Sequence, residues 1–377
     1  MTDESFGTGQ DPALTAGPEL ELNDAVLGDF DGIPAIGPVL YRDAAAALRA
    51  RLDAQARPPG SLGRLEALAV QLGQVLGSRT PRLKSPVVLL CAGDHGLVAQ
   101  GVSAWPSSVT TLMMQTILAG SATVSVLARQ HRLALRVVDC GVVEPLPRQP
   151  GLVQCAVARG TADASQGPAM TMAQCRQAIA NGRRLVAQLP GNAVLLGEMG
   201  IGNTSAASLL LARLAGLPVE AVVGAGAGLD AAGLARKRQV LSEVLAHHAD
   251  VTEAQAVLAA LGGFEIATMV GIVLQAALEN RVIVVDGFIT SAAVLVASRL
   301  QPLVLERCVF SHVSAEPGHR LMLAEMDAQP LLGFDMRLGE GSAATLVWPI
   351  LESACRVLAE VALLETVLAG KPAVPPT

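Results

Sequence analysis

The segment Ala193-Val194-Leu195-Leu196-Gly197-Glu198-Met199-Gly200-Ile201-Gly202-Asn203-Thr204 indicates how this chain folds. Its first residues form a short apolar run, which is typical of a buried parallel strand. A glycine-rich turn with one carboxylate follows, and the chain then enters a helix-length stretch rich in alanine and leucine. A strand that leads through a tight turn into a helix is the repeating unit of an α/β fold.

The same unit recurs along the chain. Short apolar runs, most of them rich in valine or leucine, alternate with helix-length segments. The expected strands cover residues 86–92, 135–140, 193–196, 219–223, 282–285 and 304–310. This alternation predicts an α/β fold with a doubly wound, six-stranded parallel sheet flanked by helices. In such sheets the ligand binds beyond the carboxyl ends of the strands, where this chain concentrates glycines, hydroxyls and acids.

Composition supports this interpretation and excludes several classes of protein. Hydrophobic residues make up 51% of the 377 residues but aromatic residues only 2%, so alanine and branched aliphatic side chains must form the core. The 37 glycines suit tight strand-to-helix turns better than a helical bundle. Eight acids and no basic residue fall in residues 1–34, which leaves 25 of the 33 acids against all 27 bases in the remainder. A nearly neutral folded part with few aromatics argues against nucleic acid as a partner.

The chain shows no sign of secretion or membrane insertion. We expect residues 1–36 to form a disordered acidic extension, which lacks the apolar region of a signal peptide. The six cysteines are scattered without a C-x-x-C pair and are interpreted as buried, reduced thiols of a cytoplasmic protein. The longest apolar stretch, residues 266–278, is interrupted by Gln275 and is too short to span a bilayer, so we expect a buried helix.

Glu340 is the first candidate for catalysis. It lies between Gly339 and Gly341, directly before an apolar, helix-length run. Glycine on both sides removes bulk, so a substrate could approach the carboxylate closely. A glutamate at a helix start is also stabilised by the helix dipole, and the local sequence alone favours this capping role over a catalytic base.

Two glycine loops are candidates for anion binding. Gly202 and Asn203 lie at a strand-to-helix turn whose free N–H groups could bind an anion, or Asn203 or Thr204 could simply cap the helix. The turn is neither a dinucleotide fingerprint nor a Walker A loop. The second loop covers residues 224–228 and precedes Arg236-Lys237-Arg238. That triplet could be a solvated helix face or could supply a phosphate-binding cation, and the sequence leaves both open.

Other motifs favour structural roles. We expect Asp94-His95 to hold loops by hydrogen bonds, and His247-His248 to lie on a polar helix face. No set of histidine, cysteine and carboxylate residues has metal-ligand spacing, so no metal is predicted. Residues 282–287 resemble half of the ribose-phosphate loop of diphosphate-dependent phosphoribosyltransferases, but Gly287 replaces the second acid that holds the ribose hydroxyls.

Several ordered blocks together resemble the nicotinate-nucleotide:dimethylbenzimidazole phosphoribosyltransferase family over residues 57–352. The blocks are Pro59-Gly60-Ser61-Leu62-Gly63-Arg64-Leu65-Glu66, Ala92-Gly93-Asp94-His95-Gly96, Gly101-Val102-Ser103-Ala104-Trp105-Pro106, residues 197–204, Asp286-Gly287-Phe288, and Arg337-Leu338-Gly339-Glu340-Gly341-Ser342. The resemblance implies a homodimer with a Rossmann-like catalytic domain over residues 86–344. It also implies a smaller helical domain built from residues 37–85 and 345–377.

The resemblance also implies roles for individual residues. Glu340 would be the catalytic base, and Glu198 is the next candidate for that role. Phosphate contacts would come from Gly200, Gly226, Lys237 and Ser314, and the benzimidazole pocket from Ser103, Trp105, Pro106 and Leu338. Trp105 departs from the tyrosine or phenylalanine that is typical of the family at this place, which leaves the preferred base open.

The implied reaction transfers the 5-phosphoribosyl group of nicotinate mononucleotide to 5,6-dimethylbenzimidazole or a related base. The products would be α-ribazole 5′-phosphate and nicotinate, used in assembly of the cobalamin nucleotide loop. The pyridinium leaves as a neutral ring and no phosphate is transferred, so neither a cofactor nor Mg²⁺ is expected. Two alternatives remain: a diphosphate-dependent phosphoribosyltransferase, which Mg²⁺-dependent turnover would favour, and a non-catalytic nucleotide-binding protein with Glu340 as a helix cap.

Overall fold

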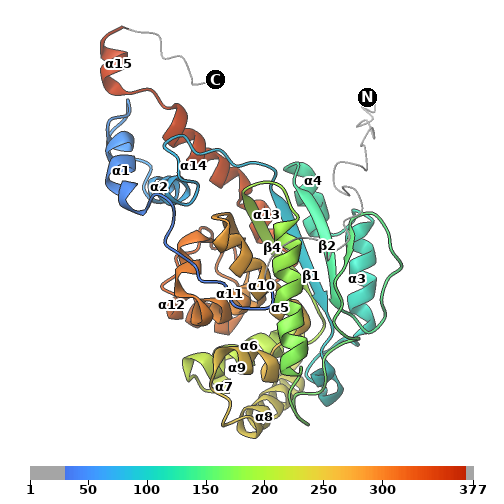
Figure 1. The fold of residues 1–377 in the computed structure, drawn as a ribbon. Helices are drawn as coiled ribbons and strands as arrows, with labels where there is room; N and C mark the ends of the chain where they lie inside the picture. Colours follow the sequence, from blue (N-terminus) through green and yellow to red (C-terminus); the bar gives the residue numbers. More distant parts are fainter. Residues whose placement is uncertain (1–29, 371–377) are drawn as a thin grey trace, which may run out of the picture.

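A six-stranded parallel sheet forms the centre of the protein in the computed structural model, which describes residues 30–370 (Figure 1). The strands are β1 (Val87–Gly93), β2 (Ala134–Gly141), β3 (Leu152–Gln154), β4 (Ala193–Met199), β5 (Val282–Val285) and β6 (Cys308–Phe310). Their order across the sheet is β3-β2-β1-β4-β5-β6, and every neighbouring pair is parallel. The strand order reverses between β1 and β4, as the predicted doubly wound α/β fold requires.

Helices connect the strands and extend beyond both ends of the sheet. The α-helices are α1 (Ala45–Asp53), α2 (Arg64–Val75), α3 (Ser108–Leu118), α4 (Thr123–Gln130), α5 (Met172–Ala187), α6 (Asn203–Ala215), α7 (Val219–Val222), α8 (Ala231–His247), α9 (Ala254–Leu261), α10 (Phe264–Leu278), α11 (Phe288–Leu300), α12 (Pro317–Glu325), α13 (Ser342–Leu346), α14 (Trp348–Glu360) and α15 (Leu364–Leu368). Three 3-10 helices are η2 (Arg42–Ala44), η3 (Gly96–Gln100) and η4 (Pro302–Arg307).

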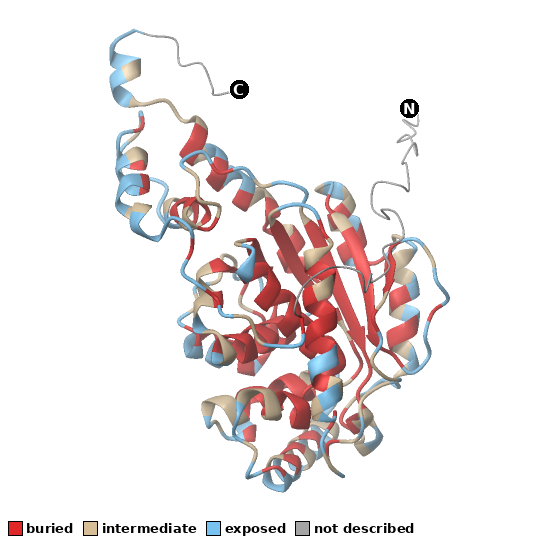
Figure 2. Cartoon of the chain, in the orientation of Figure 1, coloured by how far each residue is buried: buried red, intermediate tan, exposed pale blue. Residues whose placement is uncertain are grey.

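Side chains of the central strands alternate between two apolar layers. In β1, Leu89 and Cys91 pack into the layer formed with α5, α6, α10 and α11, whereas Val88 and Leu90 pack into the layer formed with α2, α4 and α14. This follows from the period of two in a strand. The strands are therefore buried on both faces, as the continuous red colour in Figure 2 shows.

The predicted buried helix is confirmed as α10, whose residues are buried from Phe264 to Ala277. It crosses α5 with the two backbones in contact. A Cβ atom on Gly271 would lie 2.0 Å from the carbonyl oxygen of Ile179, and one on Gly182 would lie 2.0 Å from that of Thr268. Only glycine permits this close approach, because any side chain would push the helices apart.

The expected number of strands is confirmed, but one predicted strand is wrong and one was missed. Residues 219–223 form helix α7 instead, and the buried Val219 and Val222 are spaced as on one helix face. The missed strand is β3, whose three residues add to the sheet edge by pairing with β2. The strand expected at residues 304–310 is shortened to β6, because Pro302 begins the 3-10 helix η4.

Helices α1 and α2 from the N-terminal part of the chain meet α14 from the C-terminal part in one helical region, where they share an apolar cluster (Figure 1). Arg51 donates hydrogen bonds to the carbonyls of Leu358 and Ala359, and Gln55 pairs with Leu363. These contacts support our proposal of a smaller domain formed by residues 37–85 and 345–377, of which residues 371–377 lie outside the described part. The proposed boundary at residue 345 falls inside α13, so the gap between α13 and α14 divides the chain more naturally.

The N-terminal prediction of disorder over residues 1–36 is wrong for residues 30–36. Phe30 is buried, with the guanidinium groups of Arg183 and Arg184 lying 5.4 and 5.8 Å from its ring centroid. Arg183 also donates a 2.6 Å hydrogen bond to the carbonyl of Gly32, and Ile36 is buried. Residues 30–36 therefore belong to the folded part, and residues 1–29 lie outside the described residues.

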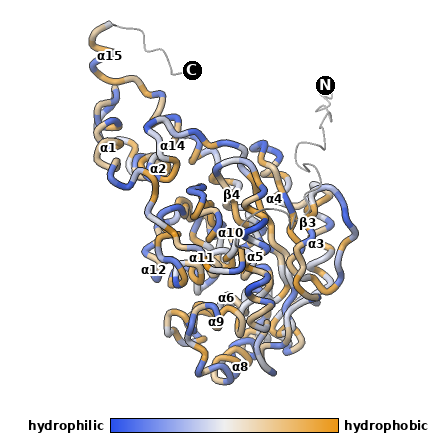
Figure 3. The backbone as a smooth tube through the Cα atoms, in the orientation of Figure 1, coloured by the Kyte–Doolittle hydropathy of each residue, from blue (hydrophilic) through white to orange (hydrophobic). Residues whose placement is uncertain are grey.

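One helical stretch, Ser108–Gln130, is apolar and long enough to cross a membrane by length and composition alone. In the structure it is divided into α3 and α4 by a turn at Gly120, and both helices pack against strands of the sheet. Polar and apolar residues are interspersed along the outer helices, as the hydropathy colours in Figure 3 show. We therefore interpret α3 and α4 as core-packing helices.

Candidate active site

A cavity of about 440 Å³ lies beyond the carboxyl ends of β4, β5 and β6, where an α/β sheet is expected to bind its ligand. The loops after these three strands line it, together with residues 337–340 and the start of α3. Eight of the predicted site residues meet here: Trp105, Glu198, Gly200, Asn203, Gly226, Ser314, Leu338 and Glu340. The other four predicted residues, Ser103, Pro106, Gly202 and Lys237, do not line the cavity.

Glu340 occupies the middle of a turn in which three successive residues are left-handed. Its φ is +63°, and those of Gly339 and Gly341 are +81° and +80°. This conformation is uncommon for a non-glycine residue. A Cβ atom on Gly339 would lie 2.1 Å from Oε1 of Glu198, and one on Gly197 would lie 2.8 Å from the carbonyl oxygen of Glu340. The glycines therefore do more than admit a substrate, because they let this turn contact the end of β4.

Asp286, at the end of β5, holds the Glu340 turn in place. Its carboxylate accepts hydrogen bonds from the backbone N–H of Ala344 at 2.9 Å and of Gly341 at 3.3 Å. It thereby satisfies free N–H groups at the start of α13. The sequence offered Asp286 as part of an incomplete ribose-phosphate motif and of one family block, without a role of its own. A lone carboxylate directly after a strand was the signal that could have indicated its role.

The Glu340 carboxyl group is buried, and its Oε2 has no hydrogen-bond partner within the described residues. Burial raises the pKa of Glu340, and a hydrogen bond from the backbone of Val124, in the first turn of α4, opposes that rise. Helix α13 has Gly341 as its N-cap and no side-chain capping bond. Glu340 therefore makes no capping bond to the helix that follows it, and its carboxyl group instead accepts from the first turn of α4.

Glu198 is a second buried carboxyl group at the cavity, and Asn203 donates a hydrogen bond to its Oε2. Burial, and next the charge of Asp286, raise the pKa of Glu198 to about 8, while the Asn203 bond opposes the rise. Burial also raises the pKa of Asp286 to about 7. The protonated form of Glu198 is therefore favoured at neutral pH. Asn203 orients it and does not cap α6, whose N-cap is Gly202 with φ of +93°.

Lys237 is buried beneath the second glycine loop. Its Nζ donates a 2.8 Å hydrogen bond to Oγ1 of Thr204, and a Cβ atom on Gly226 would lie 3.5 Å from this Nζ. Burial lowers the pKa of Lys237 to about 8, although Glu316 opposes the shift, and no salt bridge holds the ammonium group within the described residues. The alternative that Lys237 lies on a solvent-exposed helix face is therefore wrong. The adjacent Arg236 is exposed.

Ser314 is positioned by a neutral histidine behind the cavity wall. The Ser314 N–H donates a 2.8 Å hydrogen bond to Nδ1 of His319, so that nitrogen carries no proton. Nε2 of His319 lies 3.0 Å from the hydroxyl of Ser291 and donates to it. Burial, and next His312, lower the pKa of His319 to about 3, which keeps the ring neutral.

Arg337 and Glu316 also line the cavity but were not among the predicted site residues. Arg337 is exposed and is the first residue of the motif that contains Glu340, residues 337–342. Its place in that motif could have indicated that it lines the site. Ser103, although outside the cavity wall, accepts a 3.2 Å hydrogen bond from the backbone N–H of Trp105 and fixes that loop.

The structural role predicted for Asp94-His95 is confirmed. Asp94 accepts hydrogen bonds from Thr110 at 2.6 Å and from the backbone of Val143 at 2.8 Å, and His95 pairs with Glu265 at 2.8 Å. The prediction that His248 lies on a polar helix face is wrong, because its ring is buried and hydrogen-bonded to the carbonyl of Ala164.

Within residues 30–370, no three histidine, cysteine or acidic side chains lie close enough together to form a metal site.

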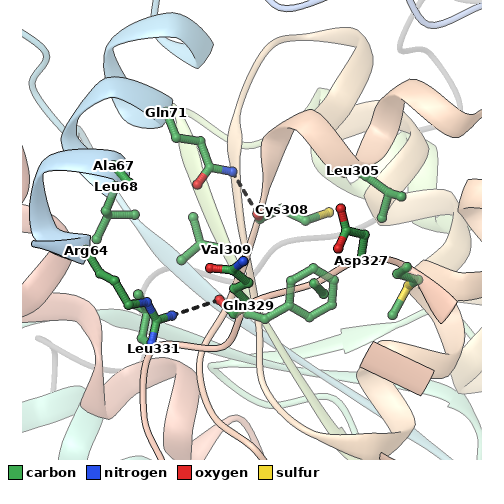
Figure 4. Close-up of a pocket in the computed structure, with 13 residues that line it drawn as sticks. Arg64, Ala67, Leu68, Gln71, Leu305, Cys308, Val309, Asp327, Gln329 and Leu331 are labelled. Atoms are coloured by element: carbon green, nitrogen blue, oxygen red, sulfur yellow. Dashed lines mark hydrogen bonds between the residues drawn. The ribbon is translucent and has the colours of Figure 1, made fainter. Parts of the chain in front are cut away.

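A second cavity of about 330 Å³ lies between α2 and β6 and contains none of the predicted site residues (Figure 4). Arg64 and Gln71 of α2 bridge it by donating to the carbonyls of Gln329, at 3.2 Å, and Cys308, at 2.9 Å. It holds none of the buried carboxyl groups described above. The cavity around Glu340 is therefore the candidate active site.

Comparison with known proteins identifies the family. A family model described as Phosphoribosyltransferase matches residues 38–367. A Variovorax paradoxus protein named nicotinate-nucleotide–dimethylbenzimidazole phosphoribosyltransferase is 62% identical over 333 residues, which cover 88% of this chain and 95% of the relative. A Cupriavidus taiwanensis protein of the same name is 53% identical over 318 residues, covering 84% and 92%.

A solved structure agrees with these matches. The crystal structure of CobT from Thermus thermophilus superimposes with a TM-score of 0.83 at 39% identity, covering 88% of this chain and 99% of that one. The chain therefore belongs to the nicotinate-nucleotide–dimethylbenzimidazole phosphoribosyltransferase family.

Proposed function

We propose that this phosphoribosyltransferase transfers the 5-phosphoribosyl group of nicotinate mononucleotide to 5,6-dimethylbenzimidazole or a related base in the cavity around Glu340. The products are α-ribazole 5′-phosphate, for the cobalamin nucleotide loop, and nicotinate. One observation carries the proposal. Glu340 is buried in a strained turn, and one oxygen of its carboxylate lacks a partner within the described residues where it borders the cavity. Backbone strain of this kind is concentrated at functional sites.

The donor phosphate binds at the two glycine loops. Gly200 and Gly226 line the cavity, and the buried ammonium group of Lys237 lies directly behind Gly226. Ser314, held by His319, lines the same cavity. Glycine loops allow a phosphate to approach backbone N–H groups closely, and Lys237 adds a fixed positive charge.

The acceptor base binds against the apolar part of the wall. Trp105, Val109, Met113 and Leu338 supply apolar surface on which a flat aromatic base can pack. Ser103 and Pro106 flank Trp105 in its loop and position it from outside the cavity. This arrangement places the acceptor next to Glu340, which follows Leu338 by two residues.

The reaction then needs one proton acceptor. A benzimidazole nitrogen forms the new bond to C1′ while the bond to the pyridinium nitrogen breaks, and that electron pair neutralises the departing nicotinate ring. The other benzimidazole nitrogen loses its proton to Glu340. Because its pKa is raised above the ordinary value, Glu340 is a stronger base than an exposed glutamate. Attack opposite the leaving group inverts the anomeric carbon from β to α.

Glu198 is better suited to donate than to accept at neutral pH, because burial raises its pKa to about 8. It remains the second candidate for the base at higher pH. No phosphoryl group is transferred and the leaving group is already cationic, so the chemistry requires neither a metal nor a cofactor. We expect EDTA to leave the rate unchanged.

We also propose that the protein acts in the cytoplasm as a homodimer, with neither nucleic acid nor membrane as a partner. The six cysteines are free and buried, which suits a reducing compartment. Helix α15 exposes Leu364, Val367 and Leu368, apolar side chains that a second subunit could cover. Light scattering of the purified protein tests the dimer.

The function is tested by incubating the purified protein with nicotinate mononucleotide and a panel of benzimidazoles, purines and phenols. We expect α-ribazole 5′-phosphate and nicotinate to form in equal amounts. Turnover of phosphoribosyl diphosphate with Mg²⁺, but not of nicotinate mononucleotide, would favour the diphosphate-dependent alternative. Nucleotide binding without turnover of any acceptor would favour a non-catalytic protein.

A further inference from the structure

Two loops from distant parts of the sequence meet at the mouth of the active-site cavity. One, between η3 and α3, carries Trp105. The other is the glycine loop of residues 224–228, between α7 and α8. The indole Nε1–H of Trp105 donates a 3.1 Å hydrogen bond to the carbonyl oxygen of Ala227, and both residues line the cavity. A single hydrogen bond therefore links the wall assigned to the acceptor with the loop assigned to the donor phosphate.

The glycine loop contains two residues whose backbone is conformationally permissive. Gly226 and Gly228 adopt left-handed conformations, with φ of +56° and +102°. Glycines in this region are conformationally permissive, so fixing them costs more entropy than fixing other residues. The backbone hydrogen bond from the Leu229 N–H to the Ala225 carbonyl is local to the loop and does not attach it to a neighbouring element.

Trp105 is itself held on its own side. The Ser103 hydroxyl accepts a hydrogen bond from the Trp105 backbone N–H, and the loop then enters α3. The Trp105 side chain remains 52% exposed, so its bond to Ala227 competes with water. Such a bond changes an equilibrium constant only about 2- to 10-fold, which suits a support that can also open.

We propose that Trp105 is a positioning residue for the donor nucleotide: its indole N–H holds the glycine loop in the conformation that binds phosphate. The ring face still contacts the acceptor, so one side chain serves both subsites. Phenylalanine and tyrosine, which are typical of the family at this place, lack an indole N–H. The inference rests on the proposed function and assigns a second role within it.

Two variants distinguish the role of the indole N–H from that of the aromatic ring face. Trp105→Phe keeps an aromatic ring but removes the donor, whereas Trp105→Leu removes both. We expect both variants to weaken nicotinate mononucleotide binding by about 2- to 10-fold, measured by calorimetry. We expect Trp105→Phe to leave the KM for dimethylbenzimidazole within about 2-fold, and Trp105→Leu to raise it further because stacking is lost. Circular dichroism confirms that each variant is folded.

Hydrogen exchange in the substrate-free protein gives a readout independent of turnover. In Trp105→Phe we expect the amides of residues 224–230 to exchange about 2- to 10-fold faster, while those of the buried helix α10 remain unchanged. Unchanged exchange in this loop, or unchanged nucleotide affinity, would overturn the inference. The unmodified protein could fail to convert nicotinate mononucleotide while Trp105→Phe still speeds exchange in the loop. In that case the proposed function is wrong, but the inference that Trp105 holds the glycine loop is retained.

Discussion

Glu340 combines a strained backbone conformation with a buried carboxyl group. It is a non-glycine residue in a left-handed conformation, which costs about 1–3 kcal/mol. It also buries a carboxyl group, whose desolvation raises its pKa. Glycine at this position would relieve the backbone strain and remove the buried acid. We propose that both costs are tolerated because a carboxylate at this point in the cavity wall accepts the acceptor's proton.

Glu340→Gln should lower kcat by about 10²- to 10⁴-fold, because it keeps the shape of the side chain and removes its basicity. Dissociation constants for both substrates should stay within about 3-fold of wild type, since the lost interaction matters mainly in the transition state. Rapid-quench kinetics and calorimetry measure the two effects. Glu325→Gln, a change at a half-exposed surface carboxylate on α12, is the control.

The pH profile gives Glu340 a second test. A base is active when deprotonated, so kcat should fall as pH decreases through the raised pKa of Glu340. The acid limb should lie above the ordinary glutamate value of about 4.3. Glu340→Gln should abolish this limb. Should the variant keep near-wild-type kcat and the same limb, the base lies elsewhere, and Glu198 is the residue to test next.

Glu198 should make stability depend on pH. Its pKa is raised to about 8 in the folded protein, so the folded state binds more protons than the unfolded state between about pH 4.3 and pH 8. Stability therefore falls as pH rises through this window. Glu198→Gln cannot ionise, so its Tm should fall less than that of wild type between pH 6 and pH 9, by about 2 °C or more. Parallel Tm curves for the two proteins would contradict this assignment.

Lys237 offers a matched pair of variants on one helix. Lys237→Met keeps most of the buried stem and removes the charge, so the KM for nicotinate mononucleotide should rise about 10- to 100-fold, as expected for a hydrogen bond to a charged group. The KM for dimethylbenzimidazole should change far less. The control is Arg236→Met, at the neighbouring exposed position. Equal effects on both substrates would place Lys237 outside the phosphate site.

Among the elements, helix contacts beneath the sheet set the position of the catalytic loops. Helix α10 crosses α5 at two glycines and also packs against β1, β4 and β5, two of which end at the active-site cavity. Because protein interiors are close-packed, a change in this crossing is transmitted to the strands. The glycines of α5 and α10 thus help to support the cavity, although neither lines it.

Gly271→Ala should destabilise the protein by about 1–3 kcal/mol or more, because the new Cβ would lie 2.0 Å from the Ile179 carbonyl oxygen and force the helices apart. Urea unfolding measures the change. Gly167→Ala is the matched control, since a Cβ there meets no atom within 4 Å. If the two variants unfold at the same urea concentration, the helix crossing is not as tight as described.

Across the molecule, residues 30–36 attach the start of the described chain to α5 and α11. Phe30 lies against Arg183 and Arg184, and the N–H of Ile36 donates to the side chain of Gln301 at 3.4 Å. The segment is thereby fixed to the large layer of helices, before the chain enters the helical region of α1, α2 and α14. Its removal should affect stability more than chemistry, because none of its residues lines the active-site cavity.

Two deletions test this arrangement. Removing residues 1–29 should leave Tm and kcat nearly unchanged. Removing residues 1–36 should lower Tm by several degrees, since burying a side chain such as Phe30 or Ile36 stabilises a protein by about 1.5–3 kcal/mol. Differential scanning calorimetry of both proteins decides the matter. A large loss of Tm on removing only residues 1–29 would show that they too pack on the fold.

Features that depend on neighbouring residues could be predicted from the sequence alone. Alternating apolar runs and helix-length segments predicted the α/β class, and the glycine turns after the strands predicted the edge at which the ligand binds. The ordered motifs predicted the family and brought Glu340, Glu198 and Lys237 forward as candidates. The predictions of the α/β class and of the edge that bears the cavity succeeded because periodicity and turn chemistry are local properties of a chain.

Features that depend on residues far apart in sequence came from tertiary packing. Strand β3 forms only because β2 offers a partner, and residues 219–222 became a helix although their apolar run resembles a strand. The burial of Lys237 beneath Gly226 and the bond between Trp105 and Ala227, 122 residues away, were not visible in any local pattern. The physical reason is that burial, pKa and contact between loops arise from packing, which brings together groups that the sequence keeps apart.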